Sequence, residues 1–232
     1  MKKSIFFTAI ITTLLCFSCA SNKVEDDYSY DYADGSYESG VMPEAPKVTE
    51  DFLGDFDVIE LESLMFLQKS NGNVKPKEIN KVYLVPRSNN VEFHFRDAVN
   101  SCCFILSYAE RQKILNACQT FLDQFEQKTL PHHKINSKTA YVASKCSLWF
   151  GLMSPASGSE QNDYFVNCEF INKQPFLLLQ FLPTRCEKSS NAFTPKISLY
   201  MSPTQIKAFM ETLKQENLNA KVEELNKKAY TY

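Results

Sequence analysis

Short runs in which apolar and polar residues alternate recur between residues 58 and 201, and this period of two is typical of half-buried β-strands. The run 91–96 shows it most clearly, because Val91, Phe93 and Phe95 alternate with polar residues. Such a strand has one buried and one solvated face. The run 176–181 is apolar throughout, which predicts a strand covered on both faces. The predicted strands are 58–68, 81–85, 91–96 and 101–107, then 141–152, 164–171, 176–182 and 196–201.

Two other stretches have apolar residues at steps of three and four, which predicts amphipathic helices. The apolar face of the first is formed by Ile114, Ala117, Cys118, Phe121, Leu122 and Phe125, and that of the second by Ile206, Phe209, Met210 and Leu213. The opposite, solvated faces carry Arg111, Lys113 and Asp123 in the first helix and Lys207, Glu211 and Lys214 in the second.

Both helices have a clear start signal. Ser107 is followed three residues later by Glu110, and Ser202 is followed in the same way by Gln205. This spacing predicts a capping box, in which the serine oxygen accepts a hydrogen bond from the backbone N–H three residues on. Pro203 stands at the first helical position, where its missing N–H leaves no hydrogen bond unmade.

The order of elements is therefore β-β-β-β-α, twice, which predicts an α+β fold of two tandem ββββα units. Each unit is expected to be an antiparallel sheet covered by one helix. The units span 58–127 and 139–232, a linker covers 128–138, and a short charged helix at 219–228 closes the chain. Ser63-Leu64-Met65-Phe66 and Ser147-Leu148-Trp149-Phe150 are similar segments at the head of each unit.

The first 19 residues have the pattern of a secretory signal. Lys2 and Lys3 precede an apolar run at 5–17, which is too short to span a bilayer, and then come Ser18 and Cys19. This ending resembles the lipobox of bacterial lipoproteins, in the relaxed form of spirochaete lipoproteins, since Cys16 stands where leucine is preferred. The resemblance implies that 1–18 are removed and that Cys19 carries the lipid. Ordinary cleavage after Ala20 is the alternative.

Residues 19–57 are predicted to be a disordered acidic tether. From residue 20 to residue 57 there are two lysines and eleven acidic residues, with few branched apolar side chains. A flexible chain of this length spans roughly 35 Å on average. The globular part from residue 58 onward has 21 basic and 16 acidic residues, a mild excess that is weak evidence for a polyanionic partner.

Six cysteines follow the lipobox, and an even number outside the cytoplasm suggests disulfides. Adjacent cysteines in a strand point to opposite faces, so one of Cys102 and Cys103 faces the core and is within reach of Cys118. Buried free thiols are the alternative. The disulfide candidates are Cys102, Cys103, Cys118, Cys146, Cys168 and Cys186.

The sequence contains no recognisable catalytic set. His132 and His133 lie beside Pro131 in the linker without a third ligand at a regular spacing, and His94 alternates with core residues and so faces solvent. The six glycines form neither a phosphate-binding loop nor a nucleophile elbow. The sequence therefore predicts no catalytic residue, no metal site and no cofactor.

Together these features favour an exported lipoprotein, anchored on the periplasmic or surface side of a bacterial membrane, that acts as a non-catalytic binding or structural module for a protein or glycan. An exported enzyme of unrecognised type is the first alternative. The ββββα order also resembles, in topology only, the Pur-alpha and positive cofactor 4 groups, which implies binding of single-stranded nucleic acid. Export argues against a nucleic-acid partner.

Overall fold

The computed structural model describes residues 52–229, apart from 80, 134, 137 and 190. The predicted signal, Cys19 and all but the end of the acidic tether lie outside the described residues. The described residues all belong to one unit of the chain, Pro46–Tyr232.

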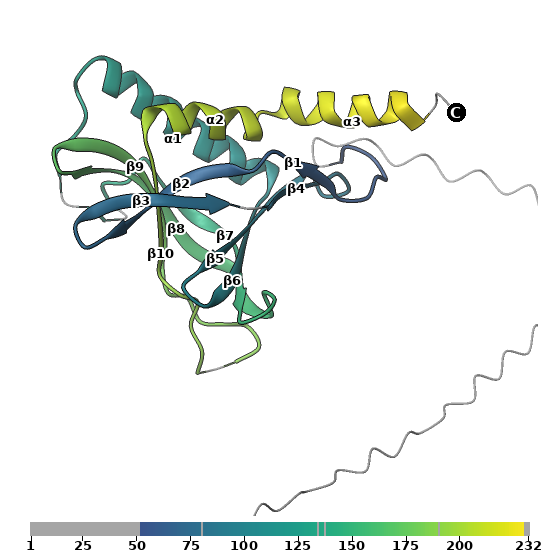
Figure 1. The fold of residues 1–232 in the computed structure, drawn as a ribbon, viewed down its shortest axis with the longest axis horizontal. Helices are drawn as coiled ribbons and strands as arrows, with labels where there is room; N and C mark the ends of the chain where they lie inside the picture. The colour runs from purple at the N-terminus through teal and green to yellow at the C-terminus, as the bar shows by residue number, and fades with distance from the viewer. Residues whose placement is uncertain (1–51, 80, 134, 137, 190, 230–232) are drawn as a thin grey trace, which may run out of the picture. The chain divides into compact units, whose positions relative to one another are not determined.

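Within this part of the chain, ten strands form one sheet of antiparallel neighbours in the order β1-β4-β5-β6-β7-β8-β9-β10-β2-β3 (Figure 1). The α+β class and the antiparallel pairing predicted from the sequence are therefore confirmed. The strands are β1 (Ile59–Leu61), β2 (Leu64–Ser70), β3 (Asn73–Ile79), β4 (Lys81–Val85), β5 (Asn90–Asp97), β6 (Asn100–Leu106), β7 (Val142–Gly151), β8 (Ser157–Ile171), β9 (Gln174–Phe181) and β10 (Ile197–Met201).

The repeat predicts a separate sheet for each half of the chain. Instead, the two halves share one sheet. β6 pairs with β7, with Ser101 opposite Gly151 and Ile105 opposite Ser147. The pairing gives the last strand of the first half and the first strand of the second half a hydrogen-bonding partner, so neither is left as an open edge. Alternation along a strand predicts which of its faces is buried, but it does not predict which strands pair with each other.

The sheet is strongly curled. Only Glu62 and Ser63 separate β1 from β2, although these strands lie near opposite ends of the strand order. The β2–β3 hairpin crosses to pair with β10 and also contacts the end of β5. There, Gln68 Nε2 donates to Asp97 Oδ1 at 2.8 Å, and Lys77 Nζ lies 3.8 Å from the same oxygen.

The alternation pattern does not predict β3, because its middle is the polar run Lys75-Pro76-Lys77-Glu78. Pro76 has no backbone N–H for a ladder, and the strand tolerates it at the edge of the sheet. Lysines on such an edge also discourage pairing with another chain. The single predicted strand 58–68 is divided into β1 and β2, and β8 begins at Ser157 rather than at 164.

The helices are α1 (Tyr108–Glu126), α2 (Pro203–Leu213) and α3 (Gln215–Ala229), and they lie on one side of the sheet in Figure 1. Both predicted N-caps are confirmed: Ser107 Oγ accepts from the N–H of Glu110 at 3.3 Å, and Ser202 Oγ accepts from that of Gln205 at 3.4 Å. The second box is complete, since the N–H of Ser202 donates to Gln205 Oε1 at 2.9 Å.

The predicted apolar helix faces are buried, with two departures. Phe125 in the last turn of α1 is exposed, and Met210 in α2 is half-buried. On the opposite side of α1 the prediction is wrong for Arg111, which is fully buried. α3 begins earlier than predicted, directly after Lys214, which ends α2 in an extended conformation.

The main core lies between the helices and one face of the sheet. The ring of Phe93 stacks on Phe104 with centroids 4.5 Å apart and lies 5.8 Å from that of Phe209 in α2, while Phe104 lies 5.0 Å from Phe181. This arrangement explains the alternation in β5, because its apolar side chains face the helices. Among the described residues, no helix is both long and apolar enough to cross a membrane.

A smaller apolar cluster covers the other face of the second half of the sheet. Ile135 of the predicted linker and Ala140, just after the linker, pack against it. β9 contributes Leu177, Leu179 and Phe181 to the main core, and Phe176 and Leu178 to the smaller cluster. The prediction that this strand is covered on both faces is therefore confirmed. The smaller cluster comprises Phe165, Ile171, Phe176, Leu178 and Tyr200.

Candidate functional site

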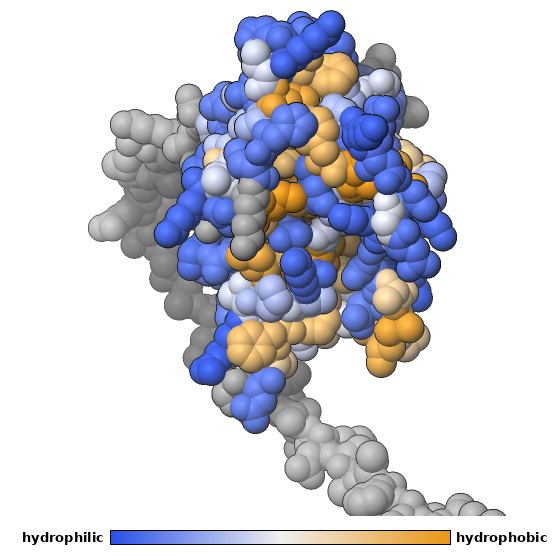
Figure 2. Space-filling model, turned by 90° about the vertical axis from the view of Figure 1, so that its left-hand side faces the viewer, coloured by the Kyte–Doolittle hydropathy of each residue, from blue (hydrophilic) through white to orange (hydrophobic). Residues whose placement is uncertain are grey.

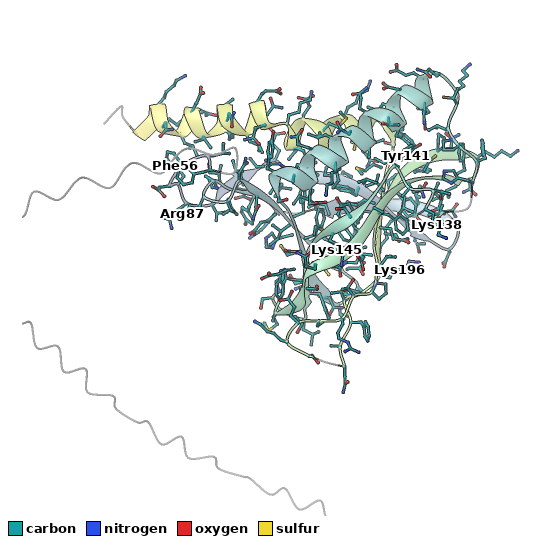
Figure 3. All side chains as sticks on the ribbon, turned by 180° about the vertical axis from the view of Figure 1, so that it is seen from behind. Phe56, Arg87, Lys138, Tyr141, Lys145 and Lys196 are labelled. Atoms are coloured by element: carbon teal, nitrogen blue, oxygen red, sulfur yellow. The ribbon has the colours of Figure 1, made fainter. Side chains whose placement is uncertain are left out.

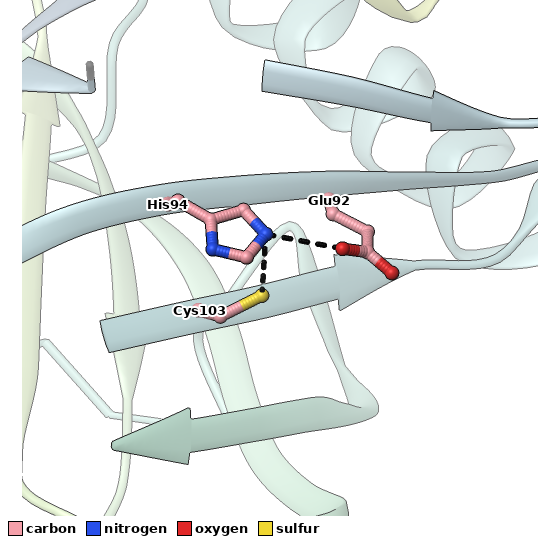
Figure 4. Close-up of side chains that lie close together, drawn as sticks. All are labelled: Glu92, His94 and Cys103. Atoms are coloured by element: carbon pink, nitrogen blue, oxygen red, sulfur yellow. Dashed lines mark hydrogen bonds and ion pairs between the residues drawn. The ribbon is translucent and has the colours of Figure 1, made fainter. Parts of the chain in front are cut away.

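Glu92, His94 and Cys103 meet on the face of the sheet opposite the main core, called the outer face below (Figure 4). The two-residue step from Glu92 to His94 puts both on one side of β5, while Phe93 between them is buried in the core. The register of β5 and β6 places Cys103 directly opposite His94. His94 Nε2 lies 3.0 Å from Glu92 Oε2 and 3.4 Å from Cys103 Sγ.

Neighbouring strands extend this cluster into a row across the outer face. Lys81 of β4 is opposite His94, and Trp149 of β7 is opposite Cys103. The ring of Tyr83 meets the His94 imidazole edge to face, with centroids 5.4 Å apart. The cluster therefore lies between an aromatic side chain of β4 and one of β7.

The thiol of Cys103 is only 4% exposed, and burial raises its pKa well above the ordinary value, with a further upward contribution from the Glu92 carboxylate. A thiol in this environment stays protonated at neutral pH and is a poor nucleophile. Moreover, Glu92 and Cys103 both contact the same imidazole nitrogen, Nε2. In a nucleophile–base–acid triad the acid binds the other nitrogen, so the arrangement differs from a cysteine hydrolase site.

A second polar cluster joins the start of α1 to β7 and β8. Lys113 Nζ lies 2.7 Å from Glu110 Oε1 and 2.9 Å from Ser144 Oγ, and the Tyr164 hydroxyl donates to Glu110 Oε2. Burial, and then this bond, raise the pKa of Tyr164. The cluster borders a pocket of about 470 Å³, which Lys145 of β7, labelled in Figure 3, also lines. These bonds fix α1 on the sheet.

A third feature is a group of exposed apolar side chains on the loops at one end of the sheet, called the loop-tip surface. Val99 in the β5–β6 turn is 65% exposed, and Leu152 and Met153 after β7 are 70% and 93% exposed. These two turns are adjacent because Ser101 pairs with Gly151. Phe193 of the β9–β10 loop is a further exposed apolar residue, at 54%, and Figure 2 shows apolar side chains at the lower end of the molecule in groups separated by polar ones.

Comparison with known proteins places the chain in a family. A family model described as "Uncharacterised Treponema protein" matches residues 58–220. The chain belongs to this family. A relative from Treponema pallidum (strain Nichols), described as "Uncharacterized protein", is 20% identical over 160 residues, which cover 68% of this chain and 57% of the relative. The chain thus spans little more than half of that relative's length. No solved structure matches the chain.

In this family member the six predicted disulfide candidates are free and buried. As expected, the adjacent cysteines point to opposite faces: Cys102 lies in the main core and Cys103 lies beside His94. Cys118 shares the core with Cys102, yet the structure holds no disulfide between them. Burial raises the pKa of each of the six thiols. Cys19 lies outside the described residues, and its lipidation stays a prediction.

The histidines are placed differently from one another. His132 stacks on Phe170 with ring centroids 4.0 Å apart, and neither it nor His133 joins a cluster of three metal-ligating groups among the described residues. His94 is on the outer face, as predicted, but it is half-buried and has two polar partners. The Glu-x-His spacing in a strand was the available signal. Cys103 could be added only once the register was known.

Proposed function

We propose that the protein is an exported lipoprotein, anchored to a bacterial membrane through Cys19, that acts as a non-catalytic binding module of the cell envelope. The basic start, the short apolar run and the Ser18-Cys19 ending support export and lipidation. The relative from Treponema, a spirochaete, agrees with a lipobox of the relaxed spirochaete kind.

The loop-tip surface is the observation that carries the binding role. Isolated exposed apolar residues are ordinary, but adjacent ones on neighbouring loops mark an interaction site. Met153 is 93% exposed, so its side chain does no packing within the described domain. Loops on a rigid sheet are also where binding residues commonly lie.

The charges beside the loop-tip surface favour a protein partner. Asp97 is next to the β5–β6 turn, and the β9–β10 loop carries Arg185, Glu187, Lys188 and Lys196. An apolar centre with a rim of both charge signs is typical of protein interfaces. A surface that inserts into anionic lipid has instead an excess of lysine and arginine. The proposed partner is therefore an envelope or host protein.

We also propose that the domain arose from two related ββββα units. Without the β2–β3 hairpin, each half is a four-stranded meander followed by a serine-capped helix: β1-β4-β5-β6-α1 and β7-β8-β9-β10-α2. The hairpin is then an insertion into the first unit. The test is superposition of the two halves in structures of further family members; different strand paths in the two halves would contradict it.

The anchor is tested by metabolic labelling with a palmitate analogue. The full chain should incorporate the label, and the Cys19→Ala variant should not, whereas Cys16→Ala should behave as the full chain does. Mass spectrometry of the mature N-terminus would show a lipidated Cys19. An unmodified terminus after Ala20 would overturn the lipid anchor and leave export intact.

The binding role is tested by site-specific photo-cross-linking in intact cells. A benzoylphenylalanine at Met153 should form an adduct of defined mass with one partner protein. The matched control is the same amino acid at Phe125, which lies at the end of α1 and is 39% exposed. The Phe125 ring stacks on Phe121, which in turn contacts Tyr141, so this position is close to the opposite end of β7. Equal labelling of the same proteins from both positions, or none from Met153, would overturn the proposal.

The row on the outer face favours a second candidate, a single-stranded nucleic-acid binder. Lys81, His94 and Trp149 combine positive charge with rings on which bases can stack. Fluorescence anisotropy with labelled oligothymidine tests it. Salt-sensitive binding that is lost in Trp149→Ala would support this role, and no binding at low salt would remove it.

A further inference from the structure

We propose that Glu92, His94 and Cys103 form a binding site for a single Zn²⁺ ion on the outer face of the sheet. The three side chains come from two paired strands, and their ligand atoms all lie within 4.8 Å of one another. The inference stands apart from the lipid anchor and from the protein partner, since it depends only on this cluster.

The two separations measured from His94 Nε2 fit a tetrahedral zinc site. With Zn–S near 2.3 Å and Zn–N and Zn–O near 2.1 Å, tetrahedral angles separate nitrogen from sulfur by about 3.6 Å and nitrogen from oxygen by about 3.4 Å. The observed separations from His94 Nε2 are 3.4 Å to Cys103 Sγ and 3.0 Å to Glu92 Oε2. Both observed separations are within a few tenths of an ångström of these values. The glutamate, whose side chain is the most flexible of the three, can supply the larger adjustment.

The ligand set selects the class of metal. Thiolate and imidazole favour zinc-like ions, whereas Mg²⁺ and Ca²⁺ take oxygen ligands almost exclusively. Binding replaces the thiol proton: one Zn²⁺ enters, Cys103 loses one proton to solvent, and the thiolate and carboxylate balance the two positive charges. Three protein ligands leave the fourth position for water or for a ligand from outside.

The strands hold the site and leave it accessible. Cross-strand pairing fixes His94 opposite Cys103 on β5 and β6, which lie between other strands of the sheet. The Tyr83 ring contacts the imidazole and restricts its orientation. The side chains of His94 and Glu92 are 30% and 26% exposed, so an ion can reach them from solvent while the sulfur is buried.

The test uses the full chain, first freed of metal with a chelator, and ZnCl₂ or CoCl₂ as the probe. Calorimetry should give one zinc per chain. Cobalt should give the intense d–d bands of a tetrahedral site together with a sulfur-to-cobalt charge-transfer band. His94→Gln, Cys103→Ser and Glu92→Gln should each weaken zinc binding by about tenfold or more. The controls His133→Gln and Cys168→Ser should bind zinc as the unmodified chain does.

A measurement on the unmodified chain covers the case in which a variant fails to fold. Zinc should slow the alkylation of Cys103 by iodoacetamide, mapped by peptide mass spectrometry, and should leave Cys186 unaffected. Zinc binding that survives both His94→Gln and Cys103→Ser, a cobalt spectrum without the sulfur band, or Cys103 alkylation that is insensitive to zinc would overturn the site.

Discussion

Arg111 Nη2 donates to Gln215 Oε1 at 2.7 Å, which joins the first turns of α1 to the start of α3, 104 residues later. Arg111 also donates to the backbone oxygen of Asn89 at 3.0 Å and to its side-chain oxygen at 2.9 Å. The guanidinium is fully buried, and its Nε has no hydrogen-bond partner among the described residues. Burial lowers the pKa of Arg111 to about 10, while the nearby Tyr108 acts in the opposite direction. One side chain thus ties two helices to the β4–β5 turn.

We expect Arg111→Ala to lower the free energy of unfolding by about 2–4 kcal/mol, because it leaves a cavity and unpaired polar groups. Arg111→Met fills the same space without a buried charge and should cost less. Urea unfolding followed by circular dichroism measures both. A larger loss for Met than for Ala would contradict this expectation, because both variants lack the hydrogen bonds and only methionine fills the space.

Gly158→Ala should be destabilising by about 1–3 kcal/mol or more, since small-to-large changes in a packed site strain the backbone. A Cβ at Gly158 would lie 2.2 Å from the backbone oxygen of Leu148 and 2.8 Å from the Cα of Trp149 on the paired strand. The control is Gly72→Asn, because Gly72 has a φ of +78° and open space around it, and asparagine tolerates that conformation. Similar melting temperatures for the two variants would contradict the register of β7 and β8.

All six cysteines of the domain should be alkylated in urea without prior reduction, because the structure holds them as free thiols. Peptide mapping by mass spectrometry of the protein, trapped directly from cells, checks each position. A linked pair of peptides, above all one joining Cys102 and Cys118, would instead support the disulfide that the predicted export signal suggests.

Alkaline pH should destabilise the protein through Cys118. Burial raises the pKa of this thiol from its ordinary value of 9.0 to about 12. The unfolded chain therefore loses the proton first: the contribution of Cys118 to stability is complete below pH 9.0 and disappears as the pH rises towards 12. Between these values the slope is at most about 1.4 kcal/mol per pH unit.

The check for Cys118 is the urea midpoint at pH 8 and at pH 10.5, for the unmodified chain and for Cys118→Ala. The alanine variant should start lower, because the core loses volume, but should lose less stability between the two pH values. Parallel losses in the two proteins would assign the alkaline effect to the other buried thiols and tyrosines.

The sequence by itself determined the local elements. The two serine caps, the apolar faces of α1 and α2 and most strands follow from patterns within a few neighbouring residues, and the structure has them where they were predicted. β3 was not predicted, because local patterns are the only signal and an edge strand with Pro76 and charged residues buries too little apolar surface to show one. The predicted export signal also rests on the sequence alone, because it lies outside the described residues.

Only the tertiary structure decided which distant residues meet. The pairing of β6 with β7 made one sheet from two halves, and the packing of α3 turned Arg111 from an expected surface residue into a buried one. The register of β5 and β6 brought Cys103 to His94 and so created the proposed metal site. Hydrophobic period fixes which face of a strand is buried, whereas register depends on contacts between segments far apart in the chain, and those contacts have no signature within either segment.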